Sequence, residues 1–144
     1  MDAQVKRGSG LSGSARARGF WDVTCYGPDG KVKWEDNFEN LVVNEGLDHL
    51  LDVTLSGGTQ DTTWFVGLTD DSPTIAAADT LASHAGWVEA TGYTGNRKAW
   101  TDGGVSSQSV DNSASKASFA ITANDTLAGA LLCGAETGTG ATLD

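Results

Sequence analysis

A Gly-Pro-Asp-Gly sequence at residues 27–30, set between two alternating runs, constrains the fold of this chain most. In residues 20–26 every second side chain belongs to one apolar face, which carries Trp21, Val23 and Cys25. Residues 31–36 alternate in the same way. A two-residue period is typical of a half-buried strand, and glycine and proline favour tight turns. The sequence therefore predicts a β-hairpin over residues 20–36.

Five further short runs predict strands, at residues 63–69, 87–90, 97–100, 116–122 and 127–133. The first is apolar on both faces, which is typical of a strand buried within a sheet. The last two flank an Asn-Asp turn, so we expect them to form a second hairpin. Its inward face would carry Ala117, Phe119 and Ile121.

One short helix is expected between the first hairpin and the buried strand. Asn44 is a favoured residue type at a helix N-cap, and the leucines at positions 47, 50 and 51 recur with helical spacing. These features predict an amphipathic helix over residues 44–53.

These elements indicate a mainly β fold class. About seven short strands with one helix are typical of an antiparallel β-sandwich or a barrel-like domain. The most apolar runs predict a core that contains Trp64, Val66, Leu68, Phe119, Ile121 and Leu131.

The first 18 residues differ in composition from the rest of the chain. Residues 1–18 are rich in glycine and serine and carry a formal charge of +3, whereas residues 19–144 carry −13. We therefore expect two parts, an extended basic N-terminal arm at 1–18 and one β-rich domain at 19–144. The arm is either a solvated tail or a segment that orders on a partner. In the second case its cations would bind that partner, namely Lys6, Arg7, Arg16 and Arg18.

Charge and hydropathy exclude several function classes. The net charge of −10 is unsuited to binding nucleic acid, which needs clustered positive charge. The sequence contains no run of about 18 apolar residues, so it predicts no membrane span. The N-terminus also lacks the apolar segment of a secretory signal. The two histidines and two cysteines have no metal-ligand spacing, and no glycine-rich nucleotide motif or catalytic triad motif is present. We therefore expect neither a cofactor nor an enzyme.

The cysteines and tryptophans suggest packing rather than chemistry. Cys25 and Cys133 could pair, but without a secretory signal two buried free thiols are favoured. Trp21, Trp64 and Trp87 lie in apolar or alternating runs and are expected in the core. Trp34 and Trp100 have charged neighbours, so we expect them at a partner interface. A sugar-binding face is the alternative use of exposed tryptophans.

Several longer strings resemble a family of virion structural proteins from tailed bacteriophages. The strings are residues 64–69, 78–87, 107–117 and 40–47, together with the first hairpin. The resemblance covers residues 21–143 and implies a structural role in the virion, with no catalytic or ligand residues to transfer. Family members continue beyond Leu143 with another strand region. We therefore expect either a truncated chain or a sheet edge that a neighbour completes.

Two functions agree with this resemblance. The first is a capsid decoration or cement protein, which docks on the lattice of the major capsid protein and stabilises it. Such a protein would be a homo-oligomer or a set of lattice-bound copies on the capsid surface, assembled in the host cytoplasm. The alternative is a tail or tail-fibre component whose tryptophans form a receptor-binding or glycan-binding face.

Overall fold

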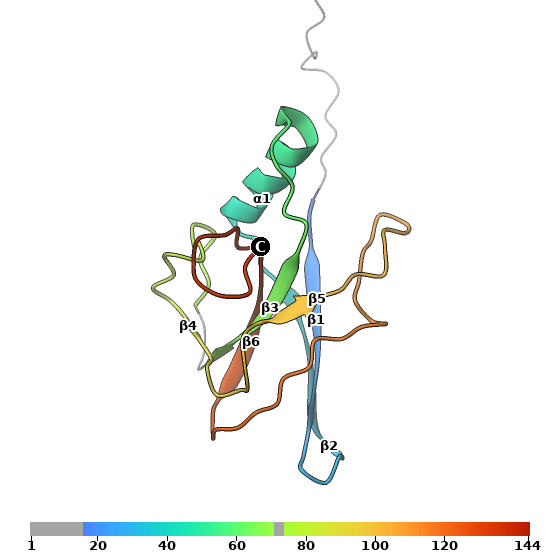
Figure 1. Cartoon of the computed structure of the whole chain (residues 1–144), viewed down its shortest axis with the longest axis vertical. Coiled ribbons are helices and arrows are strands. Elements are labelled where there is room, and N and C mark those ends of the chain that lie inside the picture. Colours follow the sequence, from blue (N-terminus) through green and yellow to red (C-terminus); the bar gives the residue numbers. More distant parts are fainter. Residues whose placement is uncertain (1–15, 71–73) are drawn as a thin grey trace, which may run out of the picture.

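The computed structural model describes residues 16–70 and 74–144, which form two antiparallel sheets and one short helix (Figure 1). A two-stranded sheet, β1–β2, packs against a four-stranded sheet made of β3 to β6. The elements in chain order are β1 Gly19–Tyr26, β2 Val32–Asn40, α1 Asn44–Leu51, the π-helical turn η1 Asp52–Ser56, β3 Trp64–Asp70, β4 Val88–Glu89, β5 Lys98–Trp100 and β6 Leu127–Cys133. The expected antiparallel, sandwich-like fold class is confirmed, and the described residues form no closed barrel.

The first hairpin is confirmed by the pairing of β1 with β2. Gly19 lies opposite Asn40, and the register continues to Cys25 opposite Trp34. The turn is closed by a bond of 2.8 Å from the Gly27 amide to the Lys31 carbonyl. Gly30 has a φ of 74°, a left-handed conformation in which glycine carries no steric penalty.

The helix expected over residues 44–53 is confirmed as α1, but the residue at its N-cap differs from the expected one. Val43 occupies the N-cap position without a side-chain cap, and Asn44 is the first helical residue, so Asn44 is not the cap. The α-helix ends at Leu51, and η1 continues it to Ser56 before Gly57 stops it with a φ of 76°. Asn44 donates its amide to the Ala77 carbonyl at 2.8 Å, which places this end of the helix against the loop before β4.

The buried strand predicted at residues 63–69 is β3, at the centre of the four-stranded sheet. β6 pairs along one edge of β3, while β5 and β4 share the other edge. Four successive residues, Val66 to Thr69, are buried. β4 and β5 lie within the strands expected at 87–90 and 97–100.

The prediction of a second hairpin is wrong. β6 pairs with β3, and residues 116–122 form no strand, only one bridge between Tyr93 and Ile121. The apolar β3 has backbone groups to satisfy along both edges, and β6 is the apolar run long enough to cover one of them. Residues 116–122 instead bond to the chain near Gly92, and Ile121 is 44% exposed rather than inward.

Two small clusters form the core. One contains Val43, Leu81, Trp87, Leu131, Cys133 and Leu143, with Phe65 and Ala141 packed against it. The other joins Leu68, Ala90, Tyr93 and Ala130 to partly buried Trp21, Phe119 and Leu127. Trp21 thus packs the hairpin onto the four-stranded sheet. Of the predicted core, Val66, Leu68 and Leu131 are buried, Trp64 and Phe119 are half-buried, and only Ile121 is exposed.

The last residues return to β6 and to the helix. Leu143 is buried and forms a bridge with Cys133. Its amide also donates to the Glu45 carboxylate at 2.9 Å. Leu143 therefore joins β6 through this bridge and joins α1 through its hydrogen bond to Glu45.

Arg97 joins three separate segments of the chain. Its guanidinium donates two bonds of 2.7 Å to the two carboxylate oxygens of Glu89 in β4. Nη1 donates to the carbonyls of Ala135 at 3.0 Å and Gly138 at 2.9 Å. The bond to Glu89 raises the pKa of Arg97. Since Arg97 is only 7% exposed, these contacts satisfy a charge that would otherwise be costly to bury.

Removal of this guanidinium should therefore destabilise the fold. We expect Arg97→Ala to lower the free energy of unfolding by about 3 kcal/mol, because Glu89 and two carbonyls lose their partner. Arg18→Ala is the matched control, since Arg18 pairs with Glu39 at 3.1 Å on the exposed surface. The control should change stability by less than about 1 kcal/mol in urea unfolding. Equal losses for the two variants would contradict the assigned role of Arg97.

A second pair of variants tests the strand pairing of β6. Leu131 is 4% exposed in the core, whereas Ile121 lies on the surface. We expect Leu131→Ala to cost about 2–5 kcal/mol and Ile121→Ala less than about 1 kcal/mol, measured by urea unfolding. A larger loss of stability for Ile121→Ala than for Leu131→Ala would contradict the pairing of β6 with β3 and favour the second hairpin predicted from the sequence.

Candidate docking surfaces

Of the four basic residues predicted to bind a partner, the structure describes only two. Lys6 and Arg7 lie outside the described residues. Arg16 is exposed, and Arg18 forms the ion pair with Glu39 on the end of the hairpin. Because both partners of this pair are largely exposed, it adds little to stability, but it shows which end of the hairpin the arm leaves.

The two predicted interface tryptophans lie on different sheets. Trp34 is on β2, opposite Cys25, and is 37% exposed. Trp100 is half-buried on β5, where it lies opposite Trp64. Because Trp34 and Trp100 lie on separate sheets, they do not form the single interface expected from the sequence.

The histidines take part in local packing. The His84 ring stacks on Trp87 with centroids 3.7 Å apart, and Asp79 accepts a bond of 3.1 Å from the Trp87 indole. His49 lies edge-on to Trp64. Among residues 16–70 and 74–144, no group of three or more His, Cys, Asp and Glu side chains could hold a metal ion. No helix in that part of the chain is long and apolar enough to cross a membrane.

Both cysteines are free thiols, as the sequence favoured. Cys133 is fully buried, and its thiol donates to the Ala135 carbonyl at 3.3 Å. Burial raises the pKa of the Cys133 thiol, which disfavours the reactive thiolate. Cys133 is therefore a packing residue.

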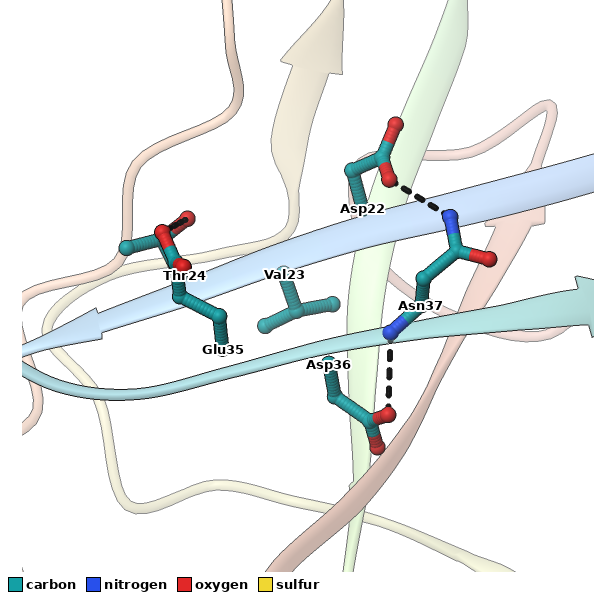
Figure 2. A pocket seen from close by; sticks show the side chains of 6 residues that line it. All are labelled: Asp22, Val23, Thr24, Glu35, Asp36 and Asn37. Carbon is teal, nitrogen blue, oxygen red and sulfur yellow. Dashed lines mark hydrogen bonds between the residues drawn. The ribbon is translucent and has the colours of Figure 1, made fainter.

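One hollow lies on the β1–β2 hairpin and has a volume of about 460 Å³ (Figure 2). Its polar side chains bond to one another across the strands. Asn37 donates to Asp22 at 2.6 Å, and Thr24 donates to Glu35 at 3.5 Å. Its carboxylates are thus engaged within the ribbon, and the hollow is an acidic surface.

A second hollow lies between the two sheets, and we call it the interlayer groove. It has a volume of about 400 Å³. Residues 38–41 at the end of β2 line one side, and residues 128–130 of β6 line the other, with Trp21, Asp36 and Ile75 completing it. The Trp21 indole N–H is buried here, and no acceptor among the described residues bonds to it. The groove is therefore lined by polar and apolar groups alike, and Asp36 and Glu39 place carboxylates at its wall.

Helix α1 and the turn η1 present an apolar surface, which we call the leucine strip. Its four members are exposed, from 39% at Leu47 to 78% at Leu55, with Leu50 and Leu51 between them. The spacing of Leu47, Leu50 and Leu51 predicted an amphipathic helix, but only the structure shows that no described residue covers this face. A second exposed apolar group, the hairpin tip, comprises Tyr26, Val32 and Trp34.

In comparisons with known proteins, no family model, curated sequence or solved structure matches the chain.

Proposed function

We propose that this chain is a structural subunit of a tailed-bacteriophage particle, a decoration or cement protein that docks on the lattice of the major capsid protein. The observation that carries the proposal is unburied apolar surface. Among the described residues, 14 large apolar side chains are exposed, whereas the core contains 11 buried hydrophobic residues. Contiguous exposed apolar surface marks sites of association in folded proteins. The choice of a phage particle as the assembly rests on the resemblance of the sequence to virion proteins.

The leucine strip is the first surface suited to docking. An eight-residue helix is too short to be stable by its own hydrogen bonds, so it depends on tertiary contacts. At its first turn Gly46 is buried and Glu45 accepts the bond from Leu143, and farther along the helix His49 lies edge-on to Trp64. Burial of a leucine side chain contributes about 1.5–3 kcal/mol, so a partner that covers the strip would gain a substantial driving force.

The hairpin tip supplies a second surface at the other end of the molecule. Figure 1 shows α1 near one end of the long axis and the β1–β2 turn at the opposite end. Tyr26 is 63% exposed, and Val32 is its partner in the strand register. Two apolar surfaces at opposite ends allow one copy to bridge two neighbours, which is what a cement protein must do.

One observation favours the tail-fibre alternative. Tyr26 and Trp34 are both exposed at the hairpin tip, and aromatic rings exposed in this way can stack on sugar rings. Under this alternative the chain would lie at the tail and its hairpin tip would contact the host. The location of the chain in the particle separates the two functions.

Particle loading tests both functions directly. Particles made without this gene would be mixed with purified chain, washed, and imaged by electron microscopy with bound copies counted. We expect many copies on the shell. Leu51→Lys combined with Leu55→Lys should reduce loading by about tenfold or more, because the variant places charge on an apolar contact.

Val105→Lys is the matched control, because Val105 is 81% exposed in a loop away from the helix and the hairpin tip. This control should load as the unaltered chain does, and circular dichroism should show that all variants are folded. Copies found only at the tail would support the fibre alternative. No binding to any part of the particle would contradict both functions.

A further inference from the structure

Carboxylates border the leucine strip. Helix α1 and the turn η1 contain three acidic residues and neither lysine nor arginine. Glu45 is already hydrogen-bonded, whereas Asp48 and Asp52 are exposed. Residues three or four apart on a helix are neighbours, so Asp48 lies beside Leu51 and Asp52 follows it one turn along. This end of the molecule therefore presents leucines with a row of negative charge beside them.

Lysines border the hairpin tip. Lys31 and Lys33 lie on either side of Val32 in the sequence, and both are exposed. The Lys31 ammonium is 3.9 Å from the Asp29 carboxylate, but these side chains are 83% and 61% exposed, so the pair is weak. Only five lysines and arginines occur in residues 19–144, and two of them are here. This end therefore presents apolar side chains with positive charge beside them.

The two surfaces cannot meet within one copy. Figure 1 shows α1 near one end of the long axis and the β1–β2 turn at the opposite end. A contact between them therefore needs two copies of the chain. Two copies that lie antiparallel make this contact twice, and copies that follow one another in a row make it once at each junction.

Charge favours a contact between unlike ends over one between like ends. Two helices packed together would bring Asp48 and Asp52 of one copy close to the same carboxylates of the other, and like charges oppose association. Two hairpin tips would bring four lysines together. A helix against a tip instead places ammonium groups beside carboxylates, while Tyr26 and Val32 cover leucines.

The size of the contact indicates a weak association. Seven exposed side chains, four of the leucine strip and three of the hairpin tip, form its apolar part. Stable complexes bury about 1,200–2,000 Å², which is more than a two-turn helix and a hairpin tip offer, so we expect a Kd of about 10 μM or above for one contact. Copies held close together on a surface would make such contacts at a high effective concentration.

We infer that the hairpin tip of one copy binds the leucine strip of a second copy, with Lys31 and Lys33 against Asp48 and Asp52. This inference rests on the proposed assembly role and deepens it, because it names another copy of the chain as a neighbour. The isolated protein is enough to test the contact, whereas the proposed function requires particles. Failure of one can therefore be distinguished from failure of the other.

The first experiment measures the mass of the full chain by analytical ultracentrifugation. At concentrations up to about 1 mM, we expect masses above the 14.9 kDa of the monomer. Lys31→Glu combined with Lys33→Glu should weaken the association by about tenfold or more, because carboxylates would then face carboxylates. Asp48→Lys combined with Asp52→Lys should weaken it similarly from the other side of the contact.

Lys116→Glu is the matched control, because Lys116 is an exposed lysine between β5 and β6, outside both surfaces. It should associate as the unaltered chain does, and urea unfolding should show that every variant is folded. A full chain that stays monomeric throughout the concentration range would overturn the inference. Lysine variants that associate as strongly as the control would also overturn it, and if the aspartate variant alone fails to associate, the contact joins two helices.

The second experiment mixes the two reversed variants. The aspartate variant has cations at both ends, and the lysine variant has carboxylates at both ends, so neither should associate by itself. In an equimolar mixture each end again meets the opposite charge, and we expect association within about threefold of that of the unaltered chain. A mixture that stays monomeric would contradict the pairing of these two ends.

Cross-linking identifies the residues in contact. A carbodiimide joins a lysine amine to a carboxylate as an amide, with the water taken up by the carbodiimide as it becomes a urea. In a mixture of ¹⁴N-labelled and ¹⁵N-labelled chains, we expect Lys33 to be joined to Asp48 or Asp52 in peptides of mixed label. Lys33 joined only to carboxylates of its own hairpin would contradict the inference.

Discussion

The contacts of Arg97 hold together the parts of the molecule on which its candidate surfaces depend. Its two bonds to Glu89 fix β4 beside the start of β5, and its bonds to Ala135 and Gly138 fix the loop after β6. That loop leads directly to Leu143, which fills the core and donates to Glu45 on the helix. The leucine strip is thus linked to Arg97 through the loop after β6 and through Leu143.

The balance of apolar surface distinguishes this fold from that of a self-contained domain. Its two clusters are small, and Ala90, Ala130 and Cys133 are among their buried members. Larger apolar side chains, such as Leu55 and Tyr26, lie on the outside. Since burial of apolar area is the main favourable term in folding, a neighbour that covers these side chains would stabilise the fold as well as the assembly.

The features that could be predicted from the sequence are those with local causes. The hairpin β1–β2 follows from a turn sequence between two alternating runs, and β3 from a short run that is apolar on both faces. The leucine spacing of α1 predicted its apolar face. Each of these patterns lies within one continuous stretch of the chain, the longest being residues 20–36, so no knowledge of distant partners was needed.

The features that could not be predicted depend on pairing between distant segments. Residues 116–122 and β6 are neighbours in sequence, yet β6 pairs with β3, because a central strand must satisfy both of its edges. The interlayer groove is lined by residues of β2 and β6, which are far apart in the sequence, so no single sequence pattern marks it. Leu50 is likewise exposed because no other described segment packs over it, which the sequence of the helix alone does not indicate.

Hydrogen–deuterium exchange of the free chain and of the particle-bound chain tests the central claim, that neighbours cover the apolar surfaces left exposed by the single chain. We expect amides of α1, η1 and the hairpin tip to exchange more slowly in the bound state, because partner contacts oppose local opening. Amides of β3, which already lies between β6 and two other strands, should change little. Equal exchange of the helix and the hairpin tip in the two states would contradict the claim.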